Sequence, residues 1–429
     1  MQVLRILKPA MSLTHSSRPF FRAGAFVLVF AFVLGTPFSA LAATASSSSS
    51  SKLEVSGWIP YWRAEAGTSD TRKHLSQLTG VNPFGYTVRG DGTLNDAMNV
   101  KGATWSKFIK DAKAKKVRVI PTIMWSDGAA THAVLSDPAK RAEHVRQIVD
   151  AVEKNNFDGI DIDYEGKRAE TRPYFSAFLK ELSTELDKKK GNKWLECTIE
   201  VRMPLEARYS GTPPAGIEYA NHLPDINKYC DRVRVMTYDQ QTADVQLNRK
   251  HAGQLYAPIS DVAWVEKTLK HMMKDIDKRK LVMGIPTYGY IWQVMPNTSG
   301  TGFSYIKMEA FNPRYGTQTA AEYGITPTRQ ASGEMGFSYV PKDNHPSLPS
   351  QSQLSAQAPR GTSSANLAAA GALMLAKKER RQAPLIYLTW SDAGAIKQKV
   401  DLAKKLGIRG VAVFKFDGGQ DAGMWGALK

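Results

Sequence analysis

Cysteine is scarce in this chain of 429 residues, where only Cys197 and Cys230 occur. Neither has Cys or His neighbours at the spacing of a zinc or iron–sulfur motif, so the sequence offers no metal site built on thiolates. The two cysteines fall low on adjacent expected strands. A disulfide is possible there if the protein is exported, but two separate buried thiols are the interpretation we prefer.

Long apolar runs are also missing. The most prominent one, residues 23–34, has 12 residues and is too short for a comfortable membrane span. It lies within segment 1–42, which has four basic residues, no acidic residue and Ala-Leu-Ala at 40–42. This pattern predicts a secretory signal peptide, with an uncleaved membrane anchor as the alternative. Residues 43–52 form a Ser-rich, flexible linker, and we expect a secreted or cell-envelope protein.

Acidic residues are outnumbered, because 40 Asp and Glu face 57 Lys and Arg and give a formal net charge of +17. Removing the four basic residues of the signal segment leaves 17 − 4 = +13. A basic surface favours anionic partners such as wall polymers or membrane surfaces, although solubility is the commoner reason for such an excess. No nucleic-acid-binding motif accompanies the charge, so we expect no nucleic-acid partner.

The most informative stretch is 157–166, Phe-Asp-Gly-Ile-Asp-Ile-Asp-Tyr-Glu-Gly. Alternate side chains of a strand share a face, so Asp161, Asp163 and Glu165 lie together while two isoleucines lie on the other face. A solvated strand face is the plain alternative, but the isoleucines indicate that the back of the strand is buried. Carboxylates forced together push one pKa up, as a general acid near neutral pH requires.

Strand-like runs alternate with amphipathic helical segments throughout residues 53–429. This alternation indicates parallel βαβ units, and eight of them predict an α/β fold, a closed (β/α)8 TIM barrel. An open doubly wound sheet is the alternative. Residues 291–384 are too long for a βα connection, and we expect a small α+β insertion there, between strand seven and the last helix–strand unit. Besides the carboxylate strand, the expected strands are Val55–Tyr61, Gly80–Val88, Val117–Met124, Leu195–Arg202, Arg232–Tyr238, Leu281–Tyr288 and Gly410–Phe416.

Residues 158–165 match the Asp-Gly-x-Asp-x-Asp-x-Glu signature of glycoside hydrolase family 18, and the chain resembles this family of chitinase-like enzymes. Met236–Asp239 resembles the family's Met-x-Tyr-Asp, and Gly284–Gly289 resembles its Gly-x-Pro-x-Tyr-Gly. Both segments end expected strands, and active sites of such barrels lie at the C-terminal strand ends. Residues 83–94 add a likeness to the branch of spore-cortex and related wall hydrolases.

The resemblance implies substrate-assisted retaining catalysis, in which the sugar supplies its own nucleophile, with no metal and no cofactor. Glu165 is then the acid, Asp163 holds the 2-acetamido group of the sugar, and Asp161 tunes Asp163 through a shared proton. The residues expected to bind substrate are Tyr238, Asp239, Trp58, Tyr288 and Phe414.

Two positions depart from the family pattern. Tyr164 stands where the aromatic residue before the glutamate is usually Trp, and Phe414 stands where the family usually has Trp at the floor of the sugar site. A phenyl ring can still stack under a sugar, with less contact area. We expect this difference to affect affinity and specificity more than the type of reaction.

The substrate expected from the resemblance is a β-linked glycan containing N-acetylglucosamine, and the protein is expected to be a monomer. Chitin, peptidoglycan and N-glycan cores all carry such a sugar. A chitinase-like protein that binds sugar without cleaving it is one alternative, although such proteins typically lose the glutamate that Glu165 supplies. A Mg²⁺ site on the three carboxylates is another, weakened because neighbouring strand ends offer few further ligands.

Overall fold

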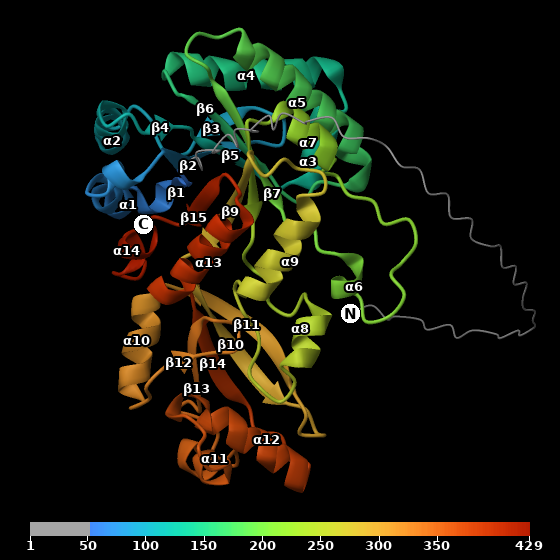
Figure 1. The fold of residues 1–429 in the computed structure, drawn as a ribbon, viewed down its shortest axis with the longest axis vertical. Helices are drawn as coiled ribbons and strands as arrows, with labels where there is room; N and C mark the ends of the chain where they lie inside the picture. Colours follow the sequence, from blue (N-terminus) through green and yellow to red (C-terminus); the bar gives the residue numbers. More distant parts are fainter. Residues whose placement is uncertain (1–51) are drawn as a thin grey trace, which may run out of the picture. The chain divides into compact units, whose positions relative to one another are not determined.

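A closed barrel of eight parallel strands forms the centre of the computed structural model, which describes residues 52–429 (Figure 1). The strands follow the order β1-β15-β9-β8-β7-β6-β5-β2, and β1 pairs with β2 to close the ring. The predicted TIM barrel is confirmed. The signal segment 1–42 and nearly all of the linker 43–52 lie outside the described residues. The barrel strands are β1 (Glu54–Pro60), β2 (Gly80–Val88), β5 (Thr122–Trp125), β6 (Gly159–Tyr164), β7 (Trp194–Glu200), β8 (Arg232–Met236), β9 (Leu281–Pro286) and β15 (Gly410–Phe414).

The third expected strand, Val117–Met124, is divided into β4 (Arg118–Val119) and β5. Pro121 lies between the two pieces and has no N–H group to give to the strand ladder. Its carbonyl still accepts a hydrogen bond from the N–H group of Asp161 at 2.9 Å, so the chain stays beside β6. A short strand, β3 (Leu94–Asp96), pairs antiparallel with the end of β2.

Helices surround the barrel, and α4 (Pro138–Lys154) shows how they form. The Asp137 side chain accepts hydrogen bonds from the N–H groups of Ala139 and Lys140, with a proline in the first turn. The buried apolar side chains of α4 recur every three or four residues, which is the spacing of one helix face. Within residues 52–429, no helix has the length and apolar content needed to cross a membrane. The other helices around the barrel are α1 (Ala64–Arg72), α2 (Ala103–Ala114), α3 (Gly128–Leu135), α5 (Arg172–Asp187), α6 (Leu205–Arg208), α7 (Leu223–Tyr229), α8 (Val245–Lys250), α9 (Val262–Met272), α13 (Ala393–Leu406) and α14 (Met424–Ala427).

Strand β6 is buried on both faces, and the two faces differ in chemistry. Ile160, Ile162 and Tyr164 belong to the apolar core between the strands and the helices, where the Tyr164 ring stacks on Phe178 with centroids 5.6 Å apart. The aspartates at alternate positions face the barrel interior. The alternation in the sequence therefore separates a packing face from a polar face, and the packing face fixes how the strand sits.

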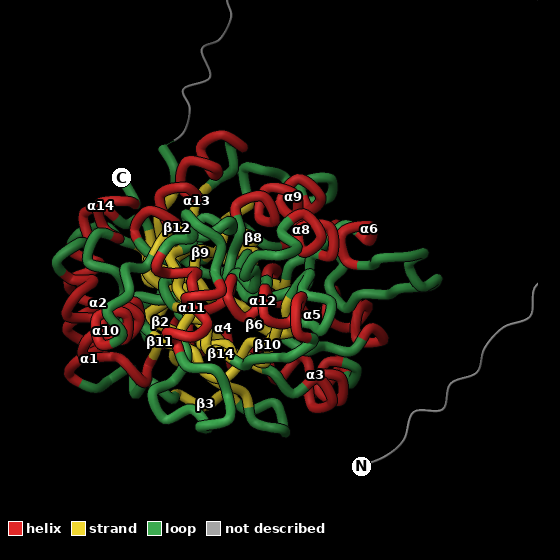
Figure 2. Tube along the Cα trace, turned by 90° about the horizontal axis from the view of Figure 1, so that it is seen from below, coloured by secondary structure: helices red, strands yellow, loops and turns green. Residues whose placement is uncertain are grey.

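The insertion is an antiparallel sheet that follows directly from the C-terminal end of β9. Its strands lie in the order β11-β10-β14-β13-β12, and Figure 2, seen from below, shows α11 and α12 in front of the barrel. The sheet runs from residue 289 to residue 390, so it is wider than the expected range 291–384 and includes a last strand that this range left out. Its elements are β10 (Gly289–Pro296), β11 (Phe303–Phe311), α10 (Pro313–Glu322), β12 (Thr328–Arg329), β13 (Met335–Tyr339), α11 (Gln351–Gln357), α12 (Leu367–Glu379) and β14 (Leu385–Trp390).

A buried carboxylate ties the insertion to the loop that follows β8. Glu334 accepts hydrogen bonds from the backbone N–H groups of Ile259 at 3.0 Å and Ser260 at 2.7 Å. The carbonyl of Ile259 in turn accepts from the N–H group of Gln240 at 3.0 Å. Gln240 directly follows the predicted Met-x-Tyr-Asp motif, so the insertion helps to hold one side of the site.

Cys197 and Cys230 form a disulfide, with Cα atoms 6.0 Å apart, inside the usual range for such a bond. The expectation of two separate thiols is therefore wrong. Cys197 faces outward from β7, because its neighbours in sequence face the barrel interior. Cys230 is the residue that ends α7, just before β8, and it meets Cys197 in the layer between strands and helices. The sequence was expected to place both cysteines low on adjacent strands, but Cys230 precedes β8, and its side-chain direction follows from how α7 ends.

Candidate active site

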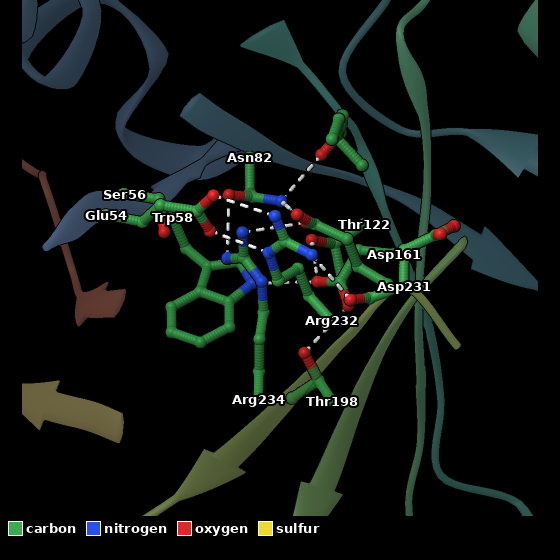
Figure 3. Close-up of polar contacts among 12 residues, drawn as sticks. Glu54, Ser56, Trp58, Asn82, Thr122, Asp161, Thr198, Asp231, Arg232 and Arg234 are labelled. Atoms are coloured by element: carbon green, nitrogen blue, oxygen red, sulfur yellow. Dashed lines mark hydrogen bonds and ion pairs between the residues drawn. The ribbon is translucent and has the colours of Figure 1, made fainter. Parts of the chain in front are cut away.

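Asp161 is the centre of a hydrogen-bond network inside the barrel (Figure 3). Its Oδ2 accepts from Thr122 Oγ1 at 2.7 Å and from Trp58 Nε1 at 3.0 Å, and its Oδ1 accepts from Thr198 Oγ1 at 2.7 Å. The residue is fully buried. Three donors satisfy a carboxylate, which can only accept, and they fix its orientation. The proton that Asp161 is expected to share with Asp163 stays a prediction.

A buried ion pair shares this part of the barrel interior. Arg234 on β8 and Glu196 on β7 lie 2.7 Å apart, each with 3% of its side chain exposed. Asn82 bridges them, since its amide donates to Glu196 at 2.8 Å and its side-chain oxygen accepts from Arg234 at 2.7 Å. The guanidinium of Arg234 also lies 5.2 Å from the ring centre of Trp58. Mutual pairing offsets the cost of burying these charges. Arg234 also packs against Trp58, one of the three donors to Asp161.

Asp163 lies two residues further along β6 and is 4% exposed. Burial raises its pKa well above the ordinary value, and the negative charges of Glu165 and Asp161 raise the pKa further. Its Oδ1 has no hydrogen-bond partner in the described part of the chain. A buried polar atom without a partner is costly, so Asp163 is prepared to bind a donor group of a ligand. No group of three or more His, Cys, Asp and Glu among residues 52–429 could hold a metal ion.

Glu165 directly follows β6, where its N–H group donates to the carbonyl of Trp125 at 2.8 Å. Burial raises the pKa of its partly buried carboxyl, and the nearby Glu200 carboxylate raises it further. The Lys167 ammonium opposes this shift, and Asp239 reinforces it. A carboxyl with a raised pKa keeps its proton at a higher pH, which suits a general acid. Burial and the row of carboxylates on β6 raise the pKa of Asp163. The raised pKa of Glu165 instead comes from burial and from Glu200 and Asp239, which lie outside that row.

Lys167 and Glu200 brace the turn that carries Glu165, and sequence reasoning missed both. Glu200 accepts from the N–H group of Gly166 at 3.1 Å and from the amide of Asn221 at 2.8 Å. The Lys167 ammonium donates to the carbonyl of Tyr164 and lies 4.0 Å from Glu200. Only 1% of the Lys167 side chain is exposed. Lys167 is two residues from the motif, but Glu200 is 35 residues from Glu165 in sequence, so only the register of β6 and β7 brings it here.

Removing the charge of Lys167 and removing the charge of Glu200 should shift the pH dependence of activity in opposite directions. Lys167→Met removes the positive charge that lowers the pKa of Glu165, so the basic limb of the kcat/KM profile should shift to higher pH. Glu200→Gln removes a negative charge that raises this pKa, so the same limb should shift to lower pH. Profiles of kcat/KM report the free enzyme. Shifts in the same direction would show that the variants act through folding instead of through charge.

Asp239 follows β8 and is held by two tyrosines, Tyr288 just after β9 and Tyr290 in β10. Its Oδ1 accepts from Tyr290 Oη at 2.6 Å and also from Tyr288 Oη. Its backbone φ is +57°, a conformation that aspartate tolerates better than most residues. A cavity of about 350 Å³ opens here, which we call the aromatic cavity. It is lined by Trp62, Asp239, Tyr288, Tyr290, Ala310, Phe311, Asn312, Phe414 and Lys415.

Phe414 ends β15 and forms one wall of the aromatic cavity. Its ring stacks on Tyr238 with centroids 5.5 Å apart and an angle of 20° between the planes. It also meets Trp58 edge to face at 6.0 Å. Its ring contacts both Tyr238 and Tyr288, and Phe414 is only partly buried.

The structure gives Trp58 a different role from the expected one, and it places a second tryptophan, Trp62, in the aromatic cavity. Trp58 was expected to bind substrate, but it is 1% exposed and donates its N–H group to Asp161, so it positions a carboxylate from within the core. Trp62, four residues later, is 51% exposed and lines the aromatic cavity. It lies past the end of β1, and active sites of barrels lie beyond the strand ends; that rule could have identified it.

Tyr164, which replaces the usual tryptophan, takes part in a buried network. Its hydroxyl donates to His144 Nε2, and the opposite ring nitrogen of His144 donates to the carbonyl of Gly92 at 2.7 Å. Burial lowers the pKa of His144 to about 4, so the ring is neutral near pH 7 and can accept from the tyrosine. The side chain faces away from the carboxylates, so the change from Trp alters core packing behind the site.

The closed barrel, the inward carboxylates of β6 and the cavity beside them define a barrel glycosidase. The family model of the glycosyl hydrolases family 18 matches residues 57–419. That range is most of the chain, and the chain belongs to this family. The enzyme class and the family expected from the motifs are confirmed.

Related proteins share sequence or fold with this chain. The glycosylase YvbX of Bacillus subtilis is 26% identical over 288 residues, which are 65% of this chain and 76% of YvbX. Chitinase A1 of Niallia circulans is 25% identical over 249 residues, 51% of this chain and 34% of that protein. The spore cortex-lytic enzyme SleL of Bacillus cereus has the same fold, with a TM-score of 0.61 and 18% identity over 88% of this chain and 73% of SleL. A class V chitinase of Pseudomonas fluorescens has a TM-score of 0.64 and 22% identity over 88% of this chain and 98% of its own.

Proposed function

We propose that this protein is an exported enzyme that cleaves β-linked glycans containing N-acetylglucosamine by substrate-assisted, retaining catalysis. The observation that carries the proposal is the pair Asp163 and Glu165. Both carboxyls have raised pKa values, and Asp163 keeps one buried oxygen without a partner. That oxygen is suited to an acetamido N–H group, and the acid beside it is suited to a leaving oxygen.

In the first step, Glu165 gives its proton to the glycosidic oxygen while the bond from that oxygen to C1 breaks. The carbonyl oxygen of the sugar's 2-acetamido group forms a bond to C1 and closes an oxazolinium ring. Asp163 accepts a hydrogen bond from the acetamido N–H group. The proton that it shares with Asp161 moves to Asp161 in this step, and the negative charge left on Asp163 stabilises the positive ring. Asp161 and its three donors keep Asp163 in place through β6.

In the second step, water attacks C1 and the bond to the acetamido oxygen breaks. Glu165, now a carboxylate, takes a proton from the water and returns to its acid form. The acetamido oxygen and the water attack C1 from opposite faces. Each attack inverts the configuration at C1, so the product keeps the configuration of the substrate. In this proposal Tyr238 donates a hydrogen bond to the acetamido carbonyl, Asp239 supports the site at the end of β8, and the ring of Phe414 forms the floor beneath the sugar.

Export is proposed on the signal segment 1–42 and is supported by the disulfide between Cys197 and Cys230, because such bonds persist in oxidising compartments. The substrate class is supported by relatives that are named for chitin and, in SleL, for spore cortex. The test is to incubate the purified protein with chitin, peptidoglycan and an N-glycan, and to identify products by mass. Release of fragments with N-acetylglucosamine at the new reducing end supports the proposal, and no release from any of the three would overturn it.

Phe414 should contribute to substrate binding beyond its part in folding. An aromatic contact of this kind is worth roughly 0.5–1.5 kcal/mol, so Phe414→Ala should lower kcat/KM about 3- to 10-fold. The kinetics should be measured at a temperature where circular dichroism shows the variant fully folded. Phe303→Ala, which truncates a partly buried phenylalanine at the far end of β11, is the control. Equal efficiency of Phe414→Ala and wild type would assign Phe414 to the core alone.

A further inference from the structure

A second cavity lies next to the turn that follows Glu165, because Glu200, one of its lining residues, accepts a hydrogen bond from the N–H group of Gly166. Its volume is about 270 Å³, and we call it the arginine pocket. It is formed after β6 and β7 and by the segment that leads to α7. Its polar lining includes Lys167, Glu200, Arg202, Arg208, Glu218 and Asn221. No residue lines both this pocket and the aromatic cavity, so the acid stands between two separate hollows.

The position of the acid decides which part of a glycan each hollow can hold. The sugar that is attacked must lie against Asp163 and Tyr238. Because Tyr238 stacks on Phe414, a lining residue of the aromatic cavity, this sugar occupies the aromatic cavity. Glu165 protonates the oxygen that leaves, so the departing sugar must lie on the other side of this carboxyl. Glu200 and Lys167 line the arginine pocket, and they are also the two charged side chains with the largest effect on the pKa of Glu165. The arginine pocket is therefore the leaving-group subsite.

The charges in the arginine pocket are unequally satisfied. Glu200 is engaged by an N–H group, an amide and Lys167, and Glu218 lies 4.0 Å from Arg172. Arg202 is partly buried, stacks over Tyr219 at 4.2 Å and donates to the carbonyl of Asn221. Neither Arg202 nor Arg208 has a carboxylate within 4.0 Å among residues 52–429. Burial lowers the pKa of Arg202, and Asp275 opposes this shift only from beyond 4.0 Å. The guanidinium therefore has no direct counter-ion within the described residues, and its burial is costly.

We infer that the arginine pocket binds a carboxylate carried by the leaving-group sugar. An amino sugar with a lactyl ether, as in muramic acid, presents such a carboxylate close to the ring. Arg202 can meet it with two parallel N–H groups while Arg208 adds charge at the rim. This inference rests on the proposed function and narrows it, because chitin has no carboxylate and peptidoglycan has one on every second sugar.

The test compares two disaccharides that differ only in the lactyl ether that carries the carboxylate. N-acetylglucosaminyl-β-1,4-N-acetylmuramic acid carries the carboxylate, and N,N′-diacetylchitobiose does not. A charge-assisted hydrogen bond is worth roughly a factor of ten, so kcat/KM should be about tenfold higher for the muramyl disaccharide. Its methyl ester, tested on the wild-type protein, should lose that preference. The ester needs no variant, so its result does not depend on folding.

Variants then assign the preference to the pocket. Arg202→Met keeps the length of the side chain and removes its charge, so it should bring the ratio of kcat/KM for the muramyl disaccharide to kcat/KM for diacetylchitobiose from about ten to about one. Arg360→Met, which removes an exposed charge between α11 and α12, is the matched control and should keep the preference. Equal kcat/KM for both disaccharides and for the ester would overturn the inference and leave the proposed function intact. No cleavage of either disaccharide, together with no release from the polymers, would instead overturn the proposed function.

Discussion

Glu165→Gln should reduce turnover by about 10²- to 10⁴-fold, the range expected when a general acid is removed. Glutamine keeps the volume and most hydrogen bonds of glutamate but has no proton to give to the glycosidic oxygen. Binding of oligosaccharide should be retained, since the aromatic cavity is unchanged. The measurements are kcat on a chitobiosyl substrate and a dissociation constant from calorimetry.

Glu379→Gln is the control for this experiment. It makes the same chemical change at the exposed end of α12 and should leave both constants at their wild-type values. Turnover within a factor of two of wild type in Glu165→Gln would reject the assignment of the acid. A loss of binding equal to the loss of turnover would mean that the variant disturbs the cavity, and not only the proton transfer.

Substrates without the 2-acetamido group should not be cleaved. The proposed first step needs the acetamido carbonyl as nucleophile, because neither Asp163 nor Asp161 is assigned that part. We therefore expect release of 4-methylumbelliferone from its chitobioside and no release above background from its cellobioside. The leaving group is the same in both, and both carry two sugars, so the comparison isolates the group at C2.

Asp163→Asn separates the two ways in which the chitobioside could be preferred. If the acetamido group is the nucleophile, the variant should be much slower on the chitobioside, because the charge that stabilises the oxazolinium ring is gone. If the acetamido group is only a binding contact, the variant should mainly raise KM. Comparable rates of wild type on the chitobioside and the cellobioside would contradict the proposed mechanism.

Sequence reasoning performed well where one strand carries the signal. The pattern of β6 identifies both its packing face and its carboxylates, because a period of two needs no knowledge of neighbouring strands. The expected strand Gly80–Val88 has the observed bounds of β2, because the turn at residues 90–92 marks its end. The break at Pro121 was readable in principle, since proline cannot donate to a ladder, but the apolar run around it looked continuous.

Prediction from the sequence failed where the direction of a side chain depends on elements far away in the sequence. Trp58 and Trp62 are in one short segment, and only the way β1 ends decides which of them faces the cavity. Glu200 meets the turn after Glu165 because β6 and β7 are neighbours in register. The disulfide depends in the same way on how α7 delivers Cys230 to β7. Such contacts are set by packing, which a single sequence does not display.

The junction between β9 and β10 limits how this enzyme could be redesigned. Tyr288 lies just after the barrel strand and Tyr290 lies in the first strand of the insertion, yet both donate to the same oxygen of Asp239. The insertion is therefore not a separable module. A chimera that exchanged it for a short loop would remove Tyr290 and the Glu334 clamp, and would leave Asp239 without half of its support. Exchanges of substrate-binding loops between relatives should keep residues up to 291 and also Glu334, which holds the loop after β8.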